Sequence, residues 1–107
     1  MTRGIKIMFK ILIVDDEKTH RIGLMKLLYT LYPEDMFLEA ASGEQALETL
    51  ELLECDIVIT DIRMPGINGL ELLHQIRKNH NDIAVIFLSG YEEFSYAKEA
   101  LKYGAKD

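Results

Sequence analysis

Short apolar runs alternate with longer amphipathic segments along this chain, and this alternation restricts the possible folds more than any other feature. The apolar runs occupy residues 9–14, 36–40, 56–60 and 84–88. The first is β-branched and nearly all apolar, which is typical of a strand covered on both faces. A segment of helical length follows each run. Strands that alternate with helices of roughly ten or more residues predict an α/β fold, with a mostly parallel sheet and helices on both faces.

The helical segments have recognisable starts, stops and inner faces. Residues 18–31 carry apolar side chains at helical spacing, and Pro33 ends that helix. Ser42 and Gln45 have the spacing of a capping box, and Asn68 is placed to cap the next helix. The positions at helical spacing that are expected on the inner faces are Ile22, Met25, Leu28 and Tyr32; Ala46, Leu47, Leu50 and Leu53; Leu70, Leu73 and Ile76; and Phe94, Ala97, Leu101 and Gly104.

Length and composition narrow the class of protein. With 107 residues, 49% of them hydrophobic and 28% charged, the chain has the size and balance of one globular domain. A net charge of −6 opposes direct binding to nucleic acid and gives no signal for a membrane surface. The single Cys55 cannot form an internal disulfide, and the sequence shows no signal peptide or long apolar span. The expected location is therefore a reducing cytoplasm.

Polar side chains follow three of the predicted strands. Asp15 and Asp16 come after the first strand, Asp61 after the third and Ser89 after the fourth. Because parallel strands end at the same edge of an open sheet, these side chains are expected to converge there. Carboxylates about 4 Å apart repel by roughly 4 kcal/mol per pair at an effective dielectric constant of about 20, so a cation or a proton must lie among them. Oxygen ligands at a solvent-facing edge suit Mg²⁺, and water and phosphate oxygens can complete its shell, which indicates a site built to meet a phosphoryl group.

Each of these residues also has a purely structural interpretation. Asp16 precedes a helix and could be its cap, and spacing alone leaves capping and metal binding equally open. Asp61 lies seven residues before Asn68, where the next helix is expected to begin, so it cannot cap that helix and a functional role is preferred. Ser89 precedes Gly90 and, taken alone, is more often a turn residue.

The three histidines invite interpretation as a phosphohistidine or as metal ligands. His20, His74 and His80 lie in separate helical or loop segments without ligand spacing. They are therefore interpreted as solvated surface residues.

Three segments together resemble the receiver domains of two-component response regulators. They are residues 14–17 (VDDE), 60–69 (TDIRMPGING) and 88–90 (LSG), each at a strand end and in the family's order. Residues 89–98 look especially like receivers joined to AraC-type DNA-binding domains. The resemblance covers residues 9–107 and implies a flavodoxin-like, doubly wound parallel sheet with strand order 2-1-3-4-5.

The resemblance implies roles for residues at the strand ends. Asp61 would be the phosphoacceptor that takes a phosphoryl group from a histidine kinase, and it would also be a metal ligand. Asp16 would bind Mg²⁺ directly, and Asp15 would act mainly through a bound water molecule. The backbone carbonyl of Arg63 would complete the protein's share of the ligands.

The same resemblance implies a switch and an output. Ser89 would donate its hydroxyl to a phosphoryl oxygen once Asp61 is modified, and would shift the population between two arrangements of its loop. Arg63 and Tyr91 would flank the acceptor and tune the rate of phosphate loss. The chain would be a signalling domain, not an enzyme that turns over an outside substrate, and would control a DNA-binding output domain of the parent protein.

The chain departs from the family pattern at both ends. Residues 1–8 are expected to be an extension that precedes the receiver domain. The sequence stops at residue 107, where the family's fifth strand would begin, so that strand, its lysine and the fifth helix are expected to be missing. Lys106 is not a substitute for that lysine, because it precedes the strand. The uncovered sheet edge would favour a homodimer or an oligomer that exchanges elements.

Two other functions stay open. A pseudo-receiver would use the same fold as an interaction module and would never carry phosphate. The other is a Mg²⁺-dependent phosphatase of a small metabolite. Enzymes of similar topology usually carry a DxD pair after the first strand, whereas Asp15 and Asp16 are adjacent.

Overall fold

The structure is a computed structural model of the chain, and it describes residues 8–80, 82–88, 98 and 102. In chain order the elements are β1 (Lys10–Val14), α1 (Lys18–Leu31), β2 (Met36–Ala40), α2 (Gly43–Leu52), β3 (Ile57–Thr60), α3 (Gly69–Asn79) and β4 (Ala84–Phe87). The predicted strands are all present, although β1, β3 and β4 are each one residue shorter than expected. The predicted fourth helix lies outside the described residues except for Lys98 and Lys102, which are helical.

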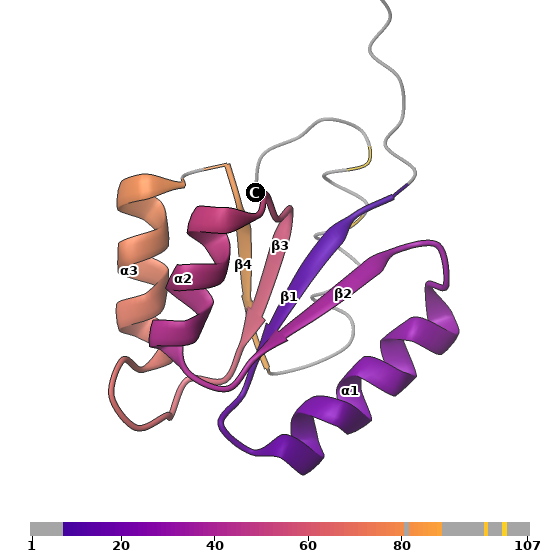
Figure 1. The fold of residues 1–107 in the computed structure, drawn as a ribbon, viewed down its shortest axis with the longest axis horizontal. Coiled ribbons are helices and arrows are strands. Elements are labelled where there is room, and N and C mark those ends of the chain that lie inside the picture. Colours follow the sequence, from indigo (N-terminus) through magenta and orange to yellow (C-terminus); the bar gives the residue numbers. More distant parts are fainter. Residues whose placement is uncertain (1–7, 81, 89–97, 99–101, 103–107) are drawn as a thin grey trace, which may run out of the picture.

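The strands form one parallel sheet in the order β2-β1-β3-β4 (Figure 1). The chain therefore starts in the middle of the sheet, moves to one edge with β2, and then returns past β1 to build the other side. This is the doubly wound, flavodoxin-like order that the sequence predicted.

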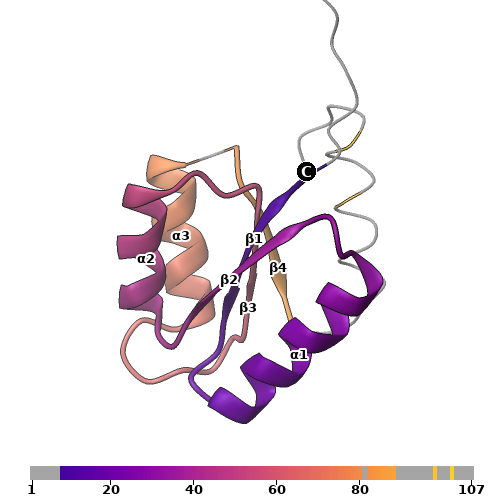
Figure 2. The same ribbon diagram turned by 45° about the vertical axis from the view of Figure 1, so that its right-hand side comes forward.

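The helices cover both faces of the sheet, with α1 on one side and α2 and α3 on the other (Figure 2). Alternate side chains of the central strands point to opposite faces. Leu12 and Val58 pack in the cluster beneath α2 and α3, whereas Ile13 and Ile59 pack in the cluster beneath α1. Burial on both faces explains why β1 is apolar after Lys10 and β3 is apolar before Thr60, as expected for a parallel sheet.

The predicted inner face of α3 was partly wrong. Leu70 was expected to point inward but is 57% exposed, and Leu72 is fully buried instead, together with Ile76. The reason is the packing of Gly69, the first residue of the helix, which is buried against the backbone after β3. This contact orients the face of Gly69, Leu72 and Ile76 toward the sheet. The prediction for Leu53 was also wrong, because this residue lies just beyond the end of α2 and is 46% exposed.

The start of α2 agrees with the predicted cap. The Ser42 hydroxyl accepts a hydrogen bond of 3.0 Å from the Gln45 backbone N–H. Gln45 reaches back to the N–H of Ala41, one residue before the cap, so the capping box is present in a shifted form.

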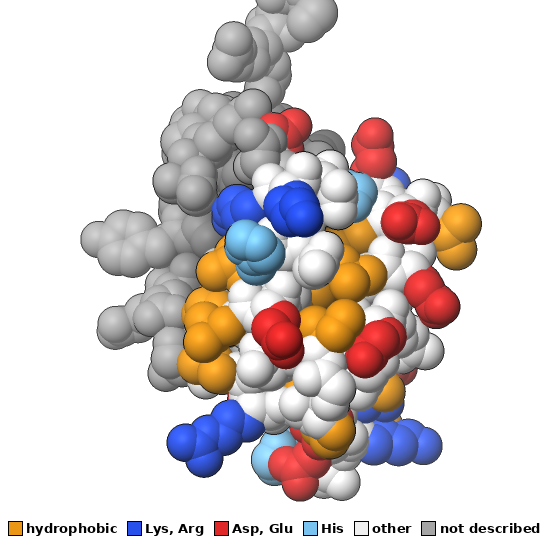
Figure 3. Space-filling view, turned by 90° about the vertical axis from the view of Figure 1, so that its left-hand side faces the viewer, with side chains coloured by type: hydrophobic (Ala, Val, Ile, Leu, Met, Phe, Trp, Pro, Cys, Tyr) orange, Lys and Arg blue, Asp and Glu red, His pale blue; other side chains and the backbone are white. Residues whose placement is uncertain are grey.

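The face formed by α2 and α3 carries mixed charge (Figure 3). Acidic side chains are spread over it between apolar patches, and the Lys and Arg side chains lie toward its two ends. This face therefore lacks a continuous basic stripe of the kind that binds a phosphate backbone. Within the described part of the chain, no helix is both long and apolar enough to cross a membrane.

Candidate functional site

The carboxyl ends of the strands meet in register at one edge of the sheet. Val14 pairs with both Ala40 and Thr60, and Thr60 pairs with Phe87. The residue that follows each of β1, β3 and β4 is then tied to the neighbouring strand. The backbone N–H of each following residue donates to a carbonyl at the end of the neighbouring strand: Asp15 to Ala40 (3.1 Å), Asp61 to Val14 (3.1 Å) and Leu88 to Thr60 (3.0 Å).

Three carboxylates converge at this edge. Asp15, Asp16 and Asp61 each offer an oxygen, and these oxygens lie within 4.8 Å of one another. Asp15 is buried, Asp61 is half-buried and Asp16 is exposed, so the group runs from the sheet outward to solvent. At such distances the charges repel strongly unless a cation or a proton compensates them. A set of oxygen ligands that opens to water is suited to a hard cation.

Local hydrogen bonds orient two of these carboxylates. Oδ1 of Asp15 accepts a bond of 2.9 Å from the N–H of Glu17, and Oδ1 of Asp61 accepts one of 2.8 Å from the N–H of Ile62. Glu17 is the N-cap of α1 and makes no side-chain cap bond. The interpretation of Asp16 as a helix cap is therefore wrong, because the cap position belongs to the next residue.

The loop after β3 keeps Asp61 apart from the next helix. Gly66 has a φ of +73°, which favours glycine, and α3 begins only at Gly69. Asn68 caps this helix through both bonds of a capping box with Glu71, of 2.9 and 3.0 Å. The prediction that Asn68 and not Asp61 caps the helix is confirmed.

Gly69 packs directly on the backbone of Asp61. A Cβ at this position would lie 2.8 Å from Cα of Ile62 and still closer to the carbonyl oxygen of Asp61. The N–H of Gly69 also donates to the carbonyl of Ile62 at 2.8 Å. The absence of a side chain thus lets α3 start against the acceptor strand.

The other predicted site residues are placed as follows. Arg63 lies in the loop between β3 and α3 with an exposed side chain. Ser89 and Tyr91 lie outside the described residues. His74 belongs to α3 and is exposed as expected, whereas His80 follows the helix and is half-buried; among the described residues neither joins the carboxylate group.

His20 was expected to be an ordinary surface residue, and its side chain is indeed 64% exposed. Its Nδ1, however, lies 2.8 Å from Oε1 of Glu17 and 3.9 Å from Oδ2 of Asp15. The prediction of a solvated surface residue is thus confirmed, and in addition these three residues form a second close group that shares Asp15. The i,i+3 spacing of Glu17 and His20 on one helix was the available signal.

Sequence reasoning also missed Arg21. Its guanidinium group donates to the backbone carbonyl of Asp15 at 2.8 Å and to the carboxylate of Glu39 at 2.6 Å. No sequence signal could have found this pair, because Glu39 lies on a different element and its contact with Arg21 exists only after the sheet has formed.

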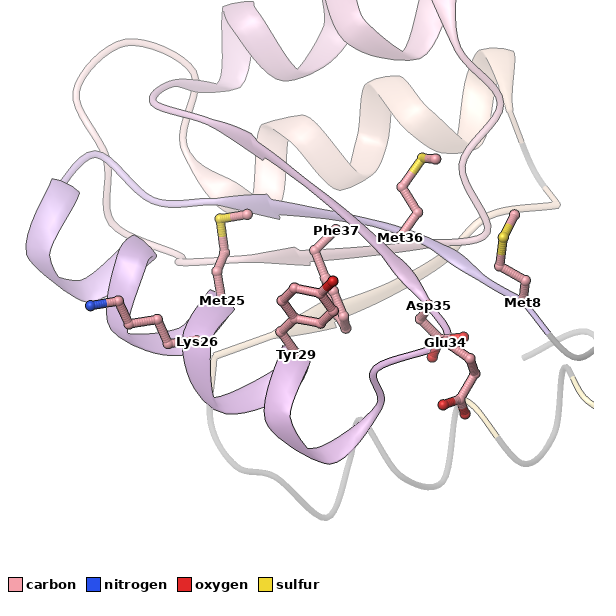
Figure 4. A pocket seen from close by; sticks show the side chains of 8 residues that line it. All are labelled: Met8, Met25, Lys26, Tyr29, Glu34, Asp35, Met36 and Phe37. Atoms are coloured by element: carbon pink, nitrogen blue, oxygen red, sulfur yellow. The ribbon is translucent and has the colours of Figure 1, made fainter.

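Two larger pockets lie away from the three carboxylates. One, of about 500 Å³, lies between α1 and the start of β2. Apolar side chains line it together with the charged side chains of Lys26, Glu34 and Asp35 (Figure 4). The other, of about 540 Å³, lies between the ends of α2 and α3 and includes Cys55 and Asp56. Burial and the Asp56 carboxylate raise the pKa of the Cys55 thiol, which disfavours its reactive thiolate form.

Comparison with known proteins agrees with this geometry. Residues 11–107 match the family model described as the response regulator receiver domain. The uncharacterized transcriptional regulatory protein YesN of Bacillus subtilis is 39% identical over 100 residues, which cover 92% of this chain and 27% of that protein. The transcriptional regulatory protein HptR of Staphylococcus aureus is 39% identical over 101 residues, covering 94% of this chain and 39% of its own length. The chain thus spans well under half of these relatives.

Solved structures show the same similarity. A two-component transcriptional regulator AraC from Clostridium phytofermentans has a TM-score of 0.69 and 36% identity, covering 92% of this chain and 78% of that one. The response regulator protein TrrA from Thermotoga maritima, in complex with Mg(2+)-BeF, has a TM-score of 0.70 and 37% identity, covering 83% of this chain and 80% of that one. From its strand order, its family match and these relatives, the chain belongs to the response regulator receiver domains of two-component systems.

Proposed function

We propose that this chain accepts a phosphoryl group on Asp61 from the phosphohistidine of a histidine kinase, and that the modification switches an output domain. The observation that carries the proposal is the convergence of the Asp15, Asp16 and Asp61 carboxylates at the carboxyl edge of the sheet. Aspartate is an established covalent acceptor of phosphate, and this edge is where parallel α/β sheets bind ligands.

The donor set fits Mg²⁺. The proposed ligands are the carboxylates of Asp15, Asp16 and Asp61 and the backbone carbonyl of Arg63, all of them hard oxygen donors. The exposed position of Asp16 leaves one side open for the water and phosphate oxygens that Mg²⁺ usually retains. When bound, Mg²⁺ would supply the positive charge that neutralises and aligns a transferring phosphoryl group. The Mg(2+)-BeF complex of the Thermotoga relative supports this assignment.

Asp61 acts as the nucleophile in the proposed reaction. One of its carboxylate oxygens forms a bond to phosphorus, the P–N bond of the kinase phosphohistidine breaks, and the leaving imidazole keeps the electron pair and takes up a proton. Asp61 is held for this step by its backbone bond to Val14 and by the N–H of Ile62 on its carboxylate. Such alignment is the main contribution a protein makes to phosphoryl transfer.

Phosphorylation would then be read by the segment after β4. In this proposal the Ser89 hydroxyl donates to a phosphoryl oxygen on Asp61, while Arg63 and Tyr91 tune how fast the phosphate is lost. Leu88, the residue before Ser89, is bonded to the carbonyl of Thr60, so the segment starts from a fixed point beside the acceptor strand.

The wider role is proposed from the relatives. YesN and HptR are named as transcriptional regulators and are longer than this chain. We therefore propose a cytoplasmic signalling domain, not an enzyme with outside substrates, that controls a DNA-binding output domain and does not bind nucleic acid itself.

The test is phosphorylation in vitro. A version of the domain that includes the family's fifth strand and helix is incubated with acetyl phosphate and Mg²⁺, and intact-mass and peptide mass spectrometry locate any acid-stable, base-labile phosphoryl adduct. The informative variant is Asp61→Asn, and the matched control is Asp56→Asn, because Asp56 lies at the opposite end of the same strand. We expect an adduct that requires Mg²⁺ in the parent chain and in Asp56→Asn, and none in Asp61→Asn.

Other outcomes would point to the other functions. Continuous release of phosphate from an excess of a small phosphorylated metabolite, without an adduct, would indicate a phosphatase. A folded chain that forms no adduct and releases no phosphate would contradict the proposal and indicate a pseudo-receiver.

A further inference from the structure

The guanidinium group of Arg21 connects the loop after β1 to the edge strand of the sheet. Its Nη1 donates a hydrogen bond of 2.8 Å to the backbone carbonyl of Asp15, and its Nε donates one of 2.6 Å to Oε1 of Glu39 in β2. Only 11% of the Arg21 side chain is exposed, so the arrangement is packed in place. Charged donors make stronger and more directional hydrogen bonds than neutral ones, and Arg21 makes two.

The carbonyl that Arg21 binds belongs to the peptide unit that joins Asp15 to Asp16. A peptide unit is planar, so fixing the direction of this oxygen also fixes the N–H and the Cα position of Asp16. The other side of Asp15 is fixed as well, because its N–H donates to the carbonyl of Ala40 and its carboxylate accepts the N–H of Glu17. The orientation of both aspartates therefore depends on contacts with β2 and with the start of α1.

We propose that Arg21 is a positioning residue for the cation site. Its bonds to Asp15 and Glu39 hold the peptide between Asp15 and Asp16 in the orientation that lets both carboxylates share one Mg²⁺. This inference rests on the proposed function, since it takes Mg²⁺ as the cation. Arg21 acts through the backbone of Asp15 and is not itself a ligand.

The charge of Arg21 and its positioning role affect Mg²⁺ binding in opposite directions. A guanidinium cation beside the carboxylates repels Mg²⁺, so losing the charge alone would tighten binding. Losing an outer hydrogen bond to a metal-binding residue weakens binding, by about 10–100-fold in other metal sites. The sign of the change in the dissociation constant therefore separates the two effects.

The experiment measures the Mg²⁺ dissociation constant by isothermal titration calorimetry and the stability of the metal-free chain by urea unfolding. Arg21→Ala removes charge and both bonds, whereas Arg21→Lys keeps the charge but lacks the planar, forked donor group that holds both acceptors. The matched control is Lys26→Ala, which removes one positive charge from an exposed position on the same helix. We expect Arg21→Ala to bind Mg²⁺ about tenfold more weakly or worse, Arg21→Lys to fall between it and the parent chain, and Lys26→Ala to be unchanged.

Folded Arg21→Ala that binds Mg²⁺ as tightly as the parent chain, or more tightly, would overturn the inference, whatever its stability. If Arg21→Ala does not fold, Glu39→Ala and Glu39→Gln decide, because both remove one charge but only glutamine keeps an acceptor for Nε of Arg21. Weaker Mg²⁺ binding by Glu39→Ala than by Glu39→Gln supports the inference, and equal binding contradicts it. If the parent chain itself binds no Mg²⁺, the proposed cation site fails and the inference fails with it. If the parent chain and Arg21→Ala bind Mg²⁺ equally well, only the positioning role of Arg21 is rejected and the proposed cation site stands.

Discussion

Replacing Gly69 with alanine should destabilise this fold, although the same exchange stabilises most helices. Gly69 is the first residue of α3, and an added Cβ would meet the carbonyl oxygen of Asp61 and Cα of Ile62. Both are backbone atoms, and backbone cannot rotate away as the end of a flexible side chain can. Either the loop that carries Asp61 or the start of α3 must therefore move.

Two opposing effects set the size of the change. Alanine is favoured over glycine by about 1 kcal/mol inside a helix, and by less at a first residue such as Gly69. Forcing a methyl group into a closely packed contact costs about 1–3 kcal/mol. Because the contact is with backbone, we expect the upper part of that range and a net loss of about 1–2 kcal/mol in the free energy of unfolding. For a domain of about this size, such a loss lowers Tm by roughly 5–15 °C.

The chain contains its own control for this substitution. Gly23 lies inside α1, is exposed, and has nothing within 4 Å of the position that a Cβ would take. Gly23→Ala should therefore raise the free energy of unfolding by about 0.5–1 kcal/mol. Urea unfolding followed by far-ultraviolet circular dichroism measures both variants. The midpoint should fall for Gly69→Ala and rise for Gly23→Ala, each by the change in free energy divided by an m-value of about 2 kcal/mol/M.

The result that would refute the reasoning is a Gly69→Ala midpoint at or above that of the parent chain. It would show that the contact between α3 and the backbone of Asp61 is loose. If the contact is tight, folded Gly69→Ala should also be phosphorylated on Asp61 more slowly than Gly23→Ala when acetyl phosphate and Mg²⁺ are supplied.

Three further predictions concern other parts of the fold. Asn68→Ala removes the bond that the Asn68 side chain accepts from the Glu71 N–H, whereas the backbone N–H of residue 68 can still donate to Glu71. The substitution should lower the free energy of unfolding in urea by about 1 kcal/mol, and an unchanged midpoint would mean that the side-chain cap is dispensable. Nζ of Lys98 lies 3.1 Å from Oδ2 of the buried Asp35, and this oxygen has no hydrogen-bond partner among the described residues. Lys98→Met removes the charged partner and should lower the free energy of unfolding by about 3–5 kcal/mol in the same assay. A loss below about 1 kcal/mol would show that the pair contributes little. Burial, and to a smaller extent the Asp56 carboxylate, raise the pKa of the Cys55 thiol above its ordinary value of 9.0. The protonated thiol therefore stabilises the fold at pH values below that ordinary pKa, and this stabilisation is lost as pH rises through the raised pKa. Between about pH 8 and about pH 10 the parent chain should therefore lose more stability than Cys55→Ala, and equal losses would argue against the raised pKa.

Much of the fold and of the candidate site could be predicted because its signals are local. Apolar runs of strand length, helical spacing and the cap at Asn68 depend on neighbours in sequence, so they predicted the elements and the parallel sheet. Strand order then places Asp15, Asp16 and Asp61 at one edge, since all parallel strands end on the same side. The convergence of these three side chains therefore follows from the order of elements and did not require knowledge of packing.

The predictions that failed depended on contacts between distant elements. Apolar spacing permitted more than one inner face for α3, and the contact of Gly69 with the backbone of Asp61 selected the face that buries Leu72 and exposes Leu70. The contact of His20 with Asp15 was not predicted at all, and it likewise depends on how α1 leaves the end of β1.

The sequence by itself determined the order of elements, the parallel sheet and the identity of the carboxylates, because periodicity and strand-end positions are properties of the chain alone. The strand order was predicted from the resemblance of its motifs to receiver domains. Only the tertiary structure decided which groups orient those carboxylates. Arg21 and Glu39 are 18 residues apart and carry no shared motif, and their hydrogen bond exists because α1 packs beside β2. A hydrogen bond requires two atoms to lie within about 3 Å of each other, and only the folded chain brings such distant residues together.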